Sequence, residues 1–163
     1  MYRLAPTPTV LVVDDDPVCL RKVDAALSVL ELDIVGALGA GAAKAFLRAC
    51  TPDLILVELA LADESGVELC RRWRNDQRLD RVPILFLTAL AAANHRSAAL
   101  SAGADDYLEK PVDSSRLQRI VRRWIATRRQ AAPEPGPRSH DGELAGALRR
   151  AALHRDLRRP IVE

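Results

Sequence analysis

The hydrophobic positions of the first 130 residues follow two different periods. Short continuous runs of aliphatic and β-branched residues are typical of strands buried on both faces. Segments with apolar residues every three to four positions are typical of helices that bury one face. The predicted strands are 9–13, 34–35, 53–57, 83–87 and 106–108, and the predicted helices are 17–30, 42–50, 64–74, 91–102 and 111–125. A strand followed by a helix, five times over, predicts an α/β domain with a doubly wound, five-stranded parallel sheet.

Local signals mark where some of these elements begin and end. Asp16 followed by Pro17 is typical of a helix N-cap with proline at the first helical position. Gly103 follows the alanine-rich segment 91–102 and is expected to end that helix.

The chain changes character near residue 130. Segment 131–142 contains three prolines and is expected to be a flexible Pro/Gly-rich linker. Segment 143–163 is expected to form a short amphipathic helix and a tail, the start of a truncated output domain. The net charge of +2 conceals the same division, because residues 1–110 carry 12 basic and 16 acidic side chains and residues 111–163 carry 12 and 6.

Composition excludes several classes of protein. No apolar run approaches the roughly 20 residues that span a bilayer, and the N-terminus lacks the apolar centre of a secretory signal. The three cysteines, Cys19, Cys50 and Cys70, form no Cys-x-x-Cys pair and are expected to be buried free thiols in a reducing compartment. No histidine has zinc-ligand spacing with them. We therefore expect a cytoplasmic protein without membrane contact.

Polar residues that can carry chemistry follow four of the predicted strands. Asp14 and Asp15 follow the first strand, Glu58 the third, Thr88 the fourth and Lys110 the fifth. The carboxyl ends of parallel strands meet at one edge of a sheet, so these side chains should gather there. Clustered carboxylates with room for water suit Mg²⁺, and a lysine with a hydroxyl suits a phosphoryl group. Lys110 also stands out because the chain has 3 lysines against 21 arginines.

These residues, in this order and spacing, resemble the receiver domain of two-component response regulators over residues 9–128. The resemblance is carried by segments 10–17, 52–57, 83–89 and 103–111, and by Gly66, eight residues after Glu58. It implies a flavodoxin-like (βα)5 fold and a bacterial phosphorelay signalling module that is not itself an enzyme. Its implied partners are a histidine kinase or phosphotransfer protein, an output domain or partner protein, and a second copy bound through the last strand and last two helices.

The resemblance also implies roles for individual residues. It assigns Mg²⁺ ligation to Asp14, Asp15, Glu58 and the backbone carbonyl of Ala60. It assigns phosphoryl contact and switching to Thr88, Lys110 and Tyr107, the aromatic whose inward or outward rotamer reports the state.

Two positions depart from the family pattern: Glu58 stands at the phosphoacceptor aspartate, and Ala62 at a usual proline. The longer arm of Glu58 displaces the reacting oxygen, and phosphoryl transfer tolerates misplacement poorly. We therefore predict inefficient phosphorylation and weakened Mg²⁺ binding. Three interpretations stay open: Glu58 biases the switch toward the active state, it forms an inert ion pair with Lys110, or it retains residual phosphorylation.

Two alternatives concern the end of the chain. Six arginines lie within 14 residues without an acid among them: Arg116, Arg119, Arg122, Arg123, Arg128 and Arg129. This suggests a DNA-binding response regulator, but no helix-turn-helix or zinc spacing accompanies it, so a solvated or receiver-contacting face is favoured over nucleic acid. Residues 159–163 are similar to the opening strand of an EAL-type cyclic-di-GMP phosphodiesterase, of which this chain would be the N-terminal regulatory part without catalytic motifs.

Overall fold

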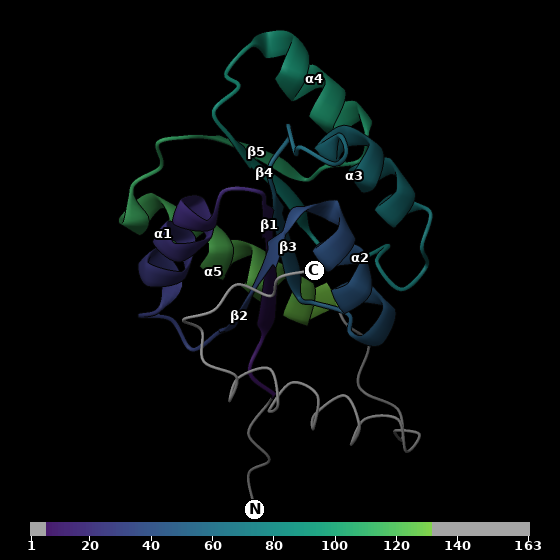
Figure 1. The fold of residues 1–163 in the computed structure, drawn as a ribbon. Helices are drawn as coiled ribbons and strands as arrows, with labels where there is room; N and C mark the ends of the chain where they lie inside the picture. Colours follow the sequence, from purple (N-terminus) through teal and green to yellow (C-terminus); the bar gives the residue numbers. More distant parts are fainter. Residues whose placement is uncertain (1–5, 132–163) are drawn as a thin grey trace, which may run out of the picture.

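A central parallel sheet with helices on both faces organises the chain (Figure 1). The computed structural model describes residues 6–131. The strands are β1 (Thr9–Asp14), β2 (Asp33–Leu38), β3 (Leu54–Val57), β4 (Ile84–Thr88) and β5 (Asp106–Glu109). The helices are α1 (Pro17–Leu27), α2 (Gly39–Ala49), α3 (Gly66–Arg74), α4 (Ala93–Ser101) and α5 (Ser114–Ala131). The strand order β2-β1-β3-β4-β5, parallel throughout, confirms the predicted doubly wound α/β fold.

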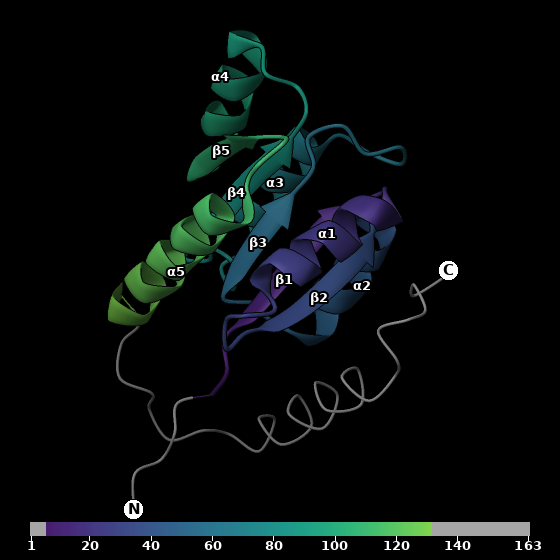
Figure 2. The same cartoon turned by 90° about the vertical axis from the view of Figure 1, so that its left-hand side faces the viewer.

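Alternate residues of the buried strands face two separate core layers. Leu11 and Val13 of β1 join the layer under α2, α3 and α4, whereas Val10 and Val12 join the layer under α1 and α5. Figure 2 looks onto the face covered by α1 and α5. Because both faces are covered, the strands need apolar residues at consecutive positions, which explains the continuous runs in the sequence.

Several element boundaries differ from the predicted ones. β2 runs over Asp33–Leu38 rather than 34–35, because this edge strand is only partly buried and its apolar pattern is weak. α2 begins at Gly39 rather than residue 42, because the Asp63 carboxylate accepts hydrogen bonds from the backbone N–H groups of Ala40 and Gly41, both at 3.1 Å. α1 ends at Leu27 rather than at residue 30.

Other local predictions are confirmed. The Asp16 carboxylate accepts a hydrogen bond from Val18 N at 2.8 Å, and Pro17 opens α1. Gly103 follows α4 with a φ of +100°, a conformation that favours glycine.

The cysteine prediction is correct in part. All three thiols are free, but only Cys70 is buried, whereas Cys19 and Cys50 are half-buried. None of the helices within residues 6–131 is both long and apolar enough to cross a membrane. The predicted linker begins at residue 131, but Ala131 is the last residue of α5; the rest of the linker and the predicted helix at 143–163 lie outside the described residues.

Candidate functional site

The side chain of Lys110 joins two acidic residues at the carboxyl edge of the sheet. Its Nζ donates to Asp14 Oδ2 at 2.7 Å and to Glu58 Oε2 at 2.8 Å. Asp14 and Glu58 are 6% and 11% exposed, so water screens these pairs only weakly. Burial opposes the charged form of Lys110, but the hydrogen bonds to both carboxylates outweigh it and raise the pKa of the ammonium. Lys110 is therefore a permanent cation between the ends of β1 and β3.

The carboxylate of Glu58 has donors on both oxygens. While Oε2 accepts from Lys110, Oε1 accepts from the backbone N–H groups of Leu59 at 2.6 Å and Ala60 at 3.3 Å. One ammonium and two amides thus surround a single built-in anion. Such an arrangement of backbone amides and a cation suits any anionic group at this position.

The aspartates assigned to Mg²⁺ accept hydrogen bonds from the protein. Asp14 Oδ1 accepts from Asp16 N, and Asp15 Oδ2 accepts from Ala62 N, each at 2.8 Å. Within residues 6–131, no group of three or more metal-binding side chains is assembled. The Mg²⁺ site therefore stays a prediction.

Two of the three predicted phosphoryl and switch residues, Thr88 and Tyr107, bond the backbone of the same residue, Leu90. Thr88, fully buried, accepts a hydrogen bond from Leu90 N through Oγ1 at 3.2 Å. Tyr107 is 3% exposed and its hydroxyl donates to the carbonyl oxygen of Leu90. Burial, followed by the negative charges of Glu109 and Glu58, raises the pKa of Tyr107. The loop between β4 and α4 is therefore bonded at Leu90 to both Thr88 and Tyr107.

Gly66 permits the close approach of α3 to the backbone of Glu58, directly after β3. A Cβ at this position would lie 2.3 Å from the carbonyl oxygen of Glu58 and 3.0 Å from both Leu59 Cα and a ring carbon of Phe86. The amide of Gly66 also donates to Leu59 O at 2.8 Å. The spacing of eight residues between Glu58 and Gly66 is thus a packing requirement of the loop after β3.

Sequence patterns did not indicate the residues that hold this loop. Asp63 caps α2, as described above, and Glu64 pairs with Lys44 at 2.7 Å and with Arg72. Burial opposes ionisation of Asp63, but the hydrogen bonds from the Ala40 and Gly41 amides together outweigh it and lower the pKa of this carboxyl. Ala40 lies 23 residues from Asp63 and Lys44 lies 20 residues from Glu64, so no local signal could have revealed these two contacts.

Three of the six arginines in the basic stretch on α5 contact other residues of the domain. Arg123 lies 3.1 Å from Asp106 Oδ2 and over the Trp124 ring, Arg128 lies 3.4 Å from Asp53 Oδ1, and Arg129 donates to Pro6 O. Arg116, Arg119 and Arg122 are exposed.

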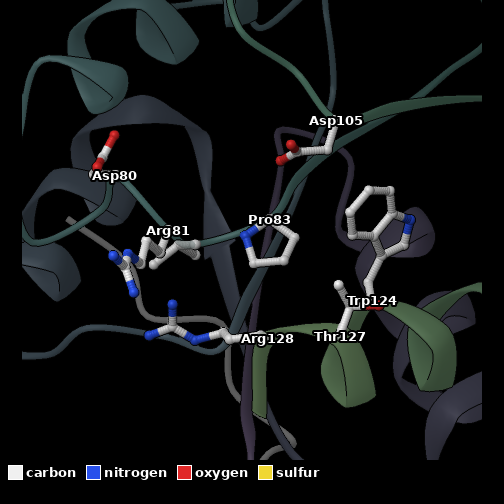
Figure 3. A pocket seen from close by; sticks show the side chains of 8 residues that line it. Asp80, Arg81, Pro83, Asp105, Trp124, Thr127 and Arg128 are labelled. Atoms are coloured by element: carbon white, nitrogen blue, oxygen red, sulfur yellow. The ribbon is translucent and has the colours of Figure 1, made fainter. Parts of the chain in front are cut away.

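A separate pocket of about 130 Å³ lies at the opposite end of the sheet (Figure 3). Pro83 and Asp105, which precede β4 and β5, line it together with Trp124, Thr127 and Arg128 of α5. None of the predicted site residues lines this pocket. It is therefore distinct from the Lys110 cluster.

A 2-1-3-4-5 parallel sheet with acids, a threonine and a lysine at its carboxyl edge defines a signalling switch domain of the receiver class. Residues 10–122 match the family described as the response regulator receiver domain. The chain belongs to this family.

Individual relatives agree with this assignment. The DNA-binding dual master transcriptional regulator RpaA of Synechocystis sp. is 35% identical over 115 residues, an alignment covering 71% of this chain and 48% of RpaA. The sensor protein GacS of Pseudomonas syringae pv. syringae is 34% identical over 131 residues, covering 78% of this chain and 14% of GacS. The crystal structure of a response regulator receiver protein from Pseudomonas putida is 30% identical, with a TM-score of 0.68, covering 74% of this chain and 99% of that chain. The chain thus spans about half, or less, of these two curated relatives.

Proposed function

We propose that this chain is a receiver module in two-component signalling whose switch is set by Glu58 rather than by phosphorylation, and that it acts through protein contacts. The observation that carries the proposal is the occupation of both Glu58 oxygens by Lys110 and two backbone amides. A phosphoryl group would bring a charge of about −1.5 to −2 and three acceptor oxygens to such a site. Glu58 brings one negative charge and two oxygens, so it substitutes for that group in part.

The geometry opposes phosphorylation of Glu58. An attacking carboxylate oxygen must approach phosphorus in line, and displacements of about 1 Å are enough to slow such reactions strongly. Here Oε2 is bound to Lys110, and Oε1 is bound to the amides of Leu59 and Ala60. These hydrogen bonds draw charge from both oxygens and hold the carboxylate in one orientation, which lowers the nucleophilicity of Glu58.

Tyr107 is the residue at which a fixed bias and an inert pocket can be told apart. Tyr107 is buried and bonded to Leu90, and Thr88 is bonded to the same residue, while the Glu58 carboxylate is engaged by Lys110. Both interpretations include the ion pair between Glu58 and Lys110. They differ in whether removal of the Glu58 charge changes the rotamer population of Tyr107. A side chain shifts a two-state equilibrium only if it interacts more strongly with one state than with the other.

A fluorine NMR experiment separates these interpretations. The chain has two tyrosines, so 3-fluorotyrosine labelling gives two signals, and Tyr2→Phe assigns them. We expect Glu58→Ala to lower the buried population of Tyr107 and Glu58→Asp to change it less. Equal populations in all three proteins would refute the fixed bias.

Phosphorylation is tested separately with Mg²⁺ and acetyl phosphate. Intact mass spectrometry should show no stoichiometric phosphoryl addition to the wild type, with Glu58→Asp as the matched positive control. A stoichiometric addition mapped to Glu58 would overturn this part of the proposal.

A DNA-binding regulator is the second candidate, because RpaA is described as a DNA-binding transcriptional regulator. Direct DNA contact by α5 would use the exposed residues Arg116, Arg119 and Arg122. Replacing all three by alanine should then weaken binding to a fluorescent duplex and reduce its salt dependence. Equal, weak binding by both proteins would leave DNA contact by this chain without support.

A further inference from the structure

Helix α4 is weakly anchored to the rest of the domain. Of its residues, only Ala99 is buried, and its N-cap residue, Ala92, provides no side-chain hydrogen bond. The first turn also lacks the acidic residue that would stabilise the helix N-terminus. The position of α4 therefore depends on few contacts.

One of these contacts joins α4 to the switch tyrosine. The guanidinium carbon of Arg96 lies 5.9 Å from the centre of the Tyr107 ring, within the range of a cation–π interaction. Within the described residues, the guanidinium has no hydrogen bond or ion pair of its own. Arg96 is exposed, whereas the ring beneath it is buried. The arginine thus lies between the switch and solvent.

The same ring is fixed at its other end by the hydroxyl. Tyr107 donates to Leu90 O, in the loop that leads into α4. The ring also lies 6.3 Å, centre to centre, from Phe86 of β4, which closes its inner side. The loop holds the polar tip of Tyr107, Phe86 lies on the core side, and Arg96 supplies the contact from α4.

We propose that Arg96 is a positioning residue that holds Tyr107 in its buried rotamer and thereby couples α4 to the switch. The inference rests on the proposed function, in which the Tyr107 rotamer reports the state set by Glu58. It adds a second determinant, on a surface helix, that acts on the same tyrosine. A cation–π contact at an exposed site corresponds to about a two- to five-fold change in the ratio of buried to exposed rotamers.

The test compares arginine variants of the full chain labelled with 3-fluorotyrosine. Arg96→Met should lower the buried-to-exposed ratio of Tyr107 by about two- to five-fold. Arg96→Lys, which keeps the charge but not the planar group, should lower it less. Arg21→Met removes an exposed arginine from α1 and serves as the matched control; it should keep the wild-type ratio.

Hydrogen exchange of the α4 amides separates a local effect on Tyr107 from general loss of the helix. Wild-type ratios in both Arg96 variants would overturn the proposal. It would also be overturned if Arg96→Met changed Tyr107 only together with loss of α4 protection while Arg96→Lys behaved as the wild type. If Glu58→Ala shifts the Tyr107 rotamer ratio and the Arg96 variants do not, the proposed coupling through Arg96 is wrong and the proposed function stands. If the Arg96 variants shift the ratio and Glu58→Ala does not, only the proposed role of Glu58 is rejected.

Discussion

Replacing Gly66 by alanine should destabilise the domain, because the new Cβ meets rigid backbone. The Cβ would lie 2.3 Å from Glu58 O and 3.0 Å from Leu59 Cα, and neither atom belongs to a side chain that could rotate away. Overpacking of this kind costs about 3 kcal/mol, at the upper end of its usual range. Alanine regains up to about 1 kcal/mol through lower chain entropy and better helix propensity. The expected net loss is about 2 kcal/mol.

Urea unfolding followed by tryptophan fluorescence measures this loss, and Gly36→Ala is the matched control. A Cβ at Gly36 would approach only the side chain of Leu20, at 3.5 Å, an ordinary van der Waals contact. We expect Gly36→Ala to remain within about 1 kcal/mol of the wild type. The 2 kcal/mol loss in Gly66→Ala corresponds to a fall in Tm of roughly 6–10 °C. Equal stability of the two variants would refute the packing explanation for the spacing between Glu58 and Gly66.

Three further predictions concern other parts of the domain. Gly103→Ala should lower the free energy of unfolding by about 1–2 kcal/mol, measured by urea unfolding, because alanine is strained at a φ of +100°; an unchanged midpoint would contradict this. The lowered pKa of Asp63 implies stability that is present above its unfolded pKa of about 3.9 and lost as pH falls through the folded pKa. The difference in urea midpoint between the wild type and Asp63→Asn should therefore be largest near pH 6 and shrink below about pH 4, and a constant difference would refute the assignment. Burial, with a hydrogen bond to Asp14, raises the pKa of Cys19 to about 11, so little thiolate is present at pH 7. In a Cys50→Ser/Cys70→Ser background, Cys19 should therefore react with a disulfide reagent at pH 7 more slowly than glutathione does, and an equal rate would contradict this.

The layered fold could be predicted from sequence because its signals are local. Each buried strand shows as a continuous apolar run, and Asp16 with Pro17 marks a helix start without reference to any other element. The position of the polar residues followed from topology alone, since parallel strands bring their carboxyl ends to one edge. The structure accordingly places Lys110 within hydrogen-bond distance of Asp14 and Glu58.

The features that the sequence patterns did not predict depend on contacts between segments that are distant along the chain. The start of α2 is set by Asp63, which lies in the loop after β3. Leu90 is the common partner of Thr88 and Tyr107, yet it contributes through its backbone, which no residue type reveals. The contact of Arg96 with Tyr107 likewise requires the packing of α4 against β5.

The central claim is that Glu58, and not a phosphoryl group, sets the switch. Its most direct test is the fluorine signal of Tyr107 in the wild type and in Glu58→Asp, recorded before and after addition of Mg²⁺ and acetyl phosphate. The account predicts an unchanged signal in the wild type and a changed signal in Glu58→Asp. A wild-type signal that shifts as far as that of Glu58→Asp would contradict it.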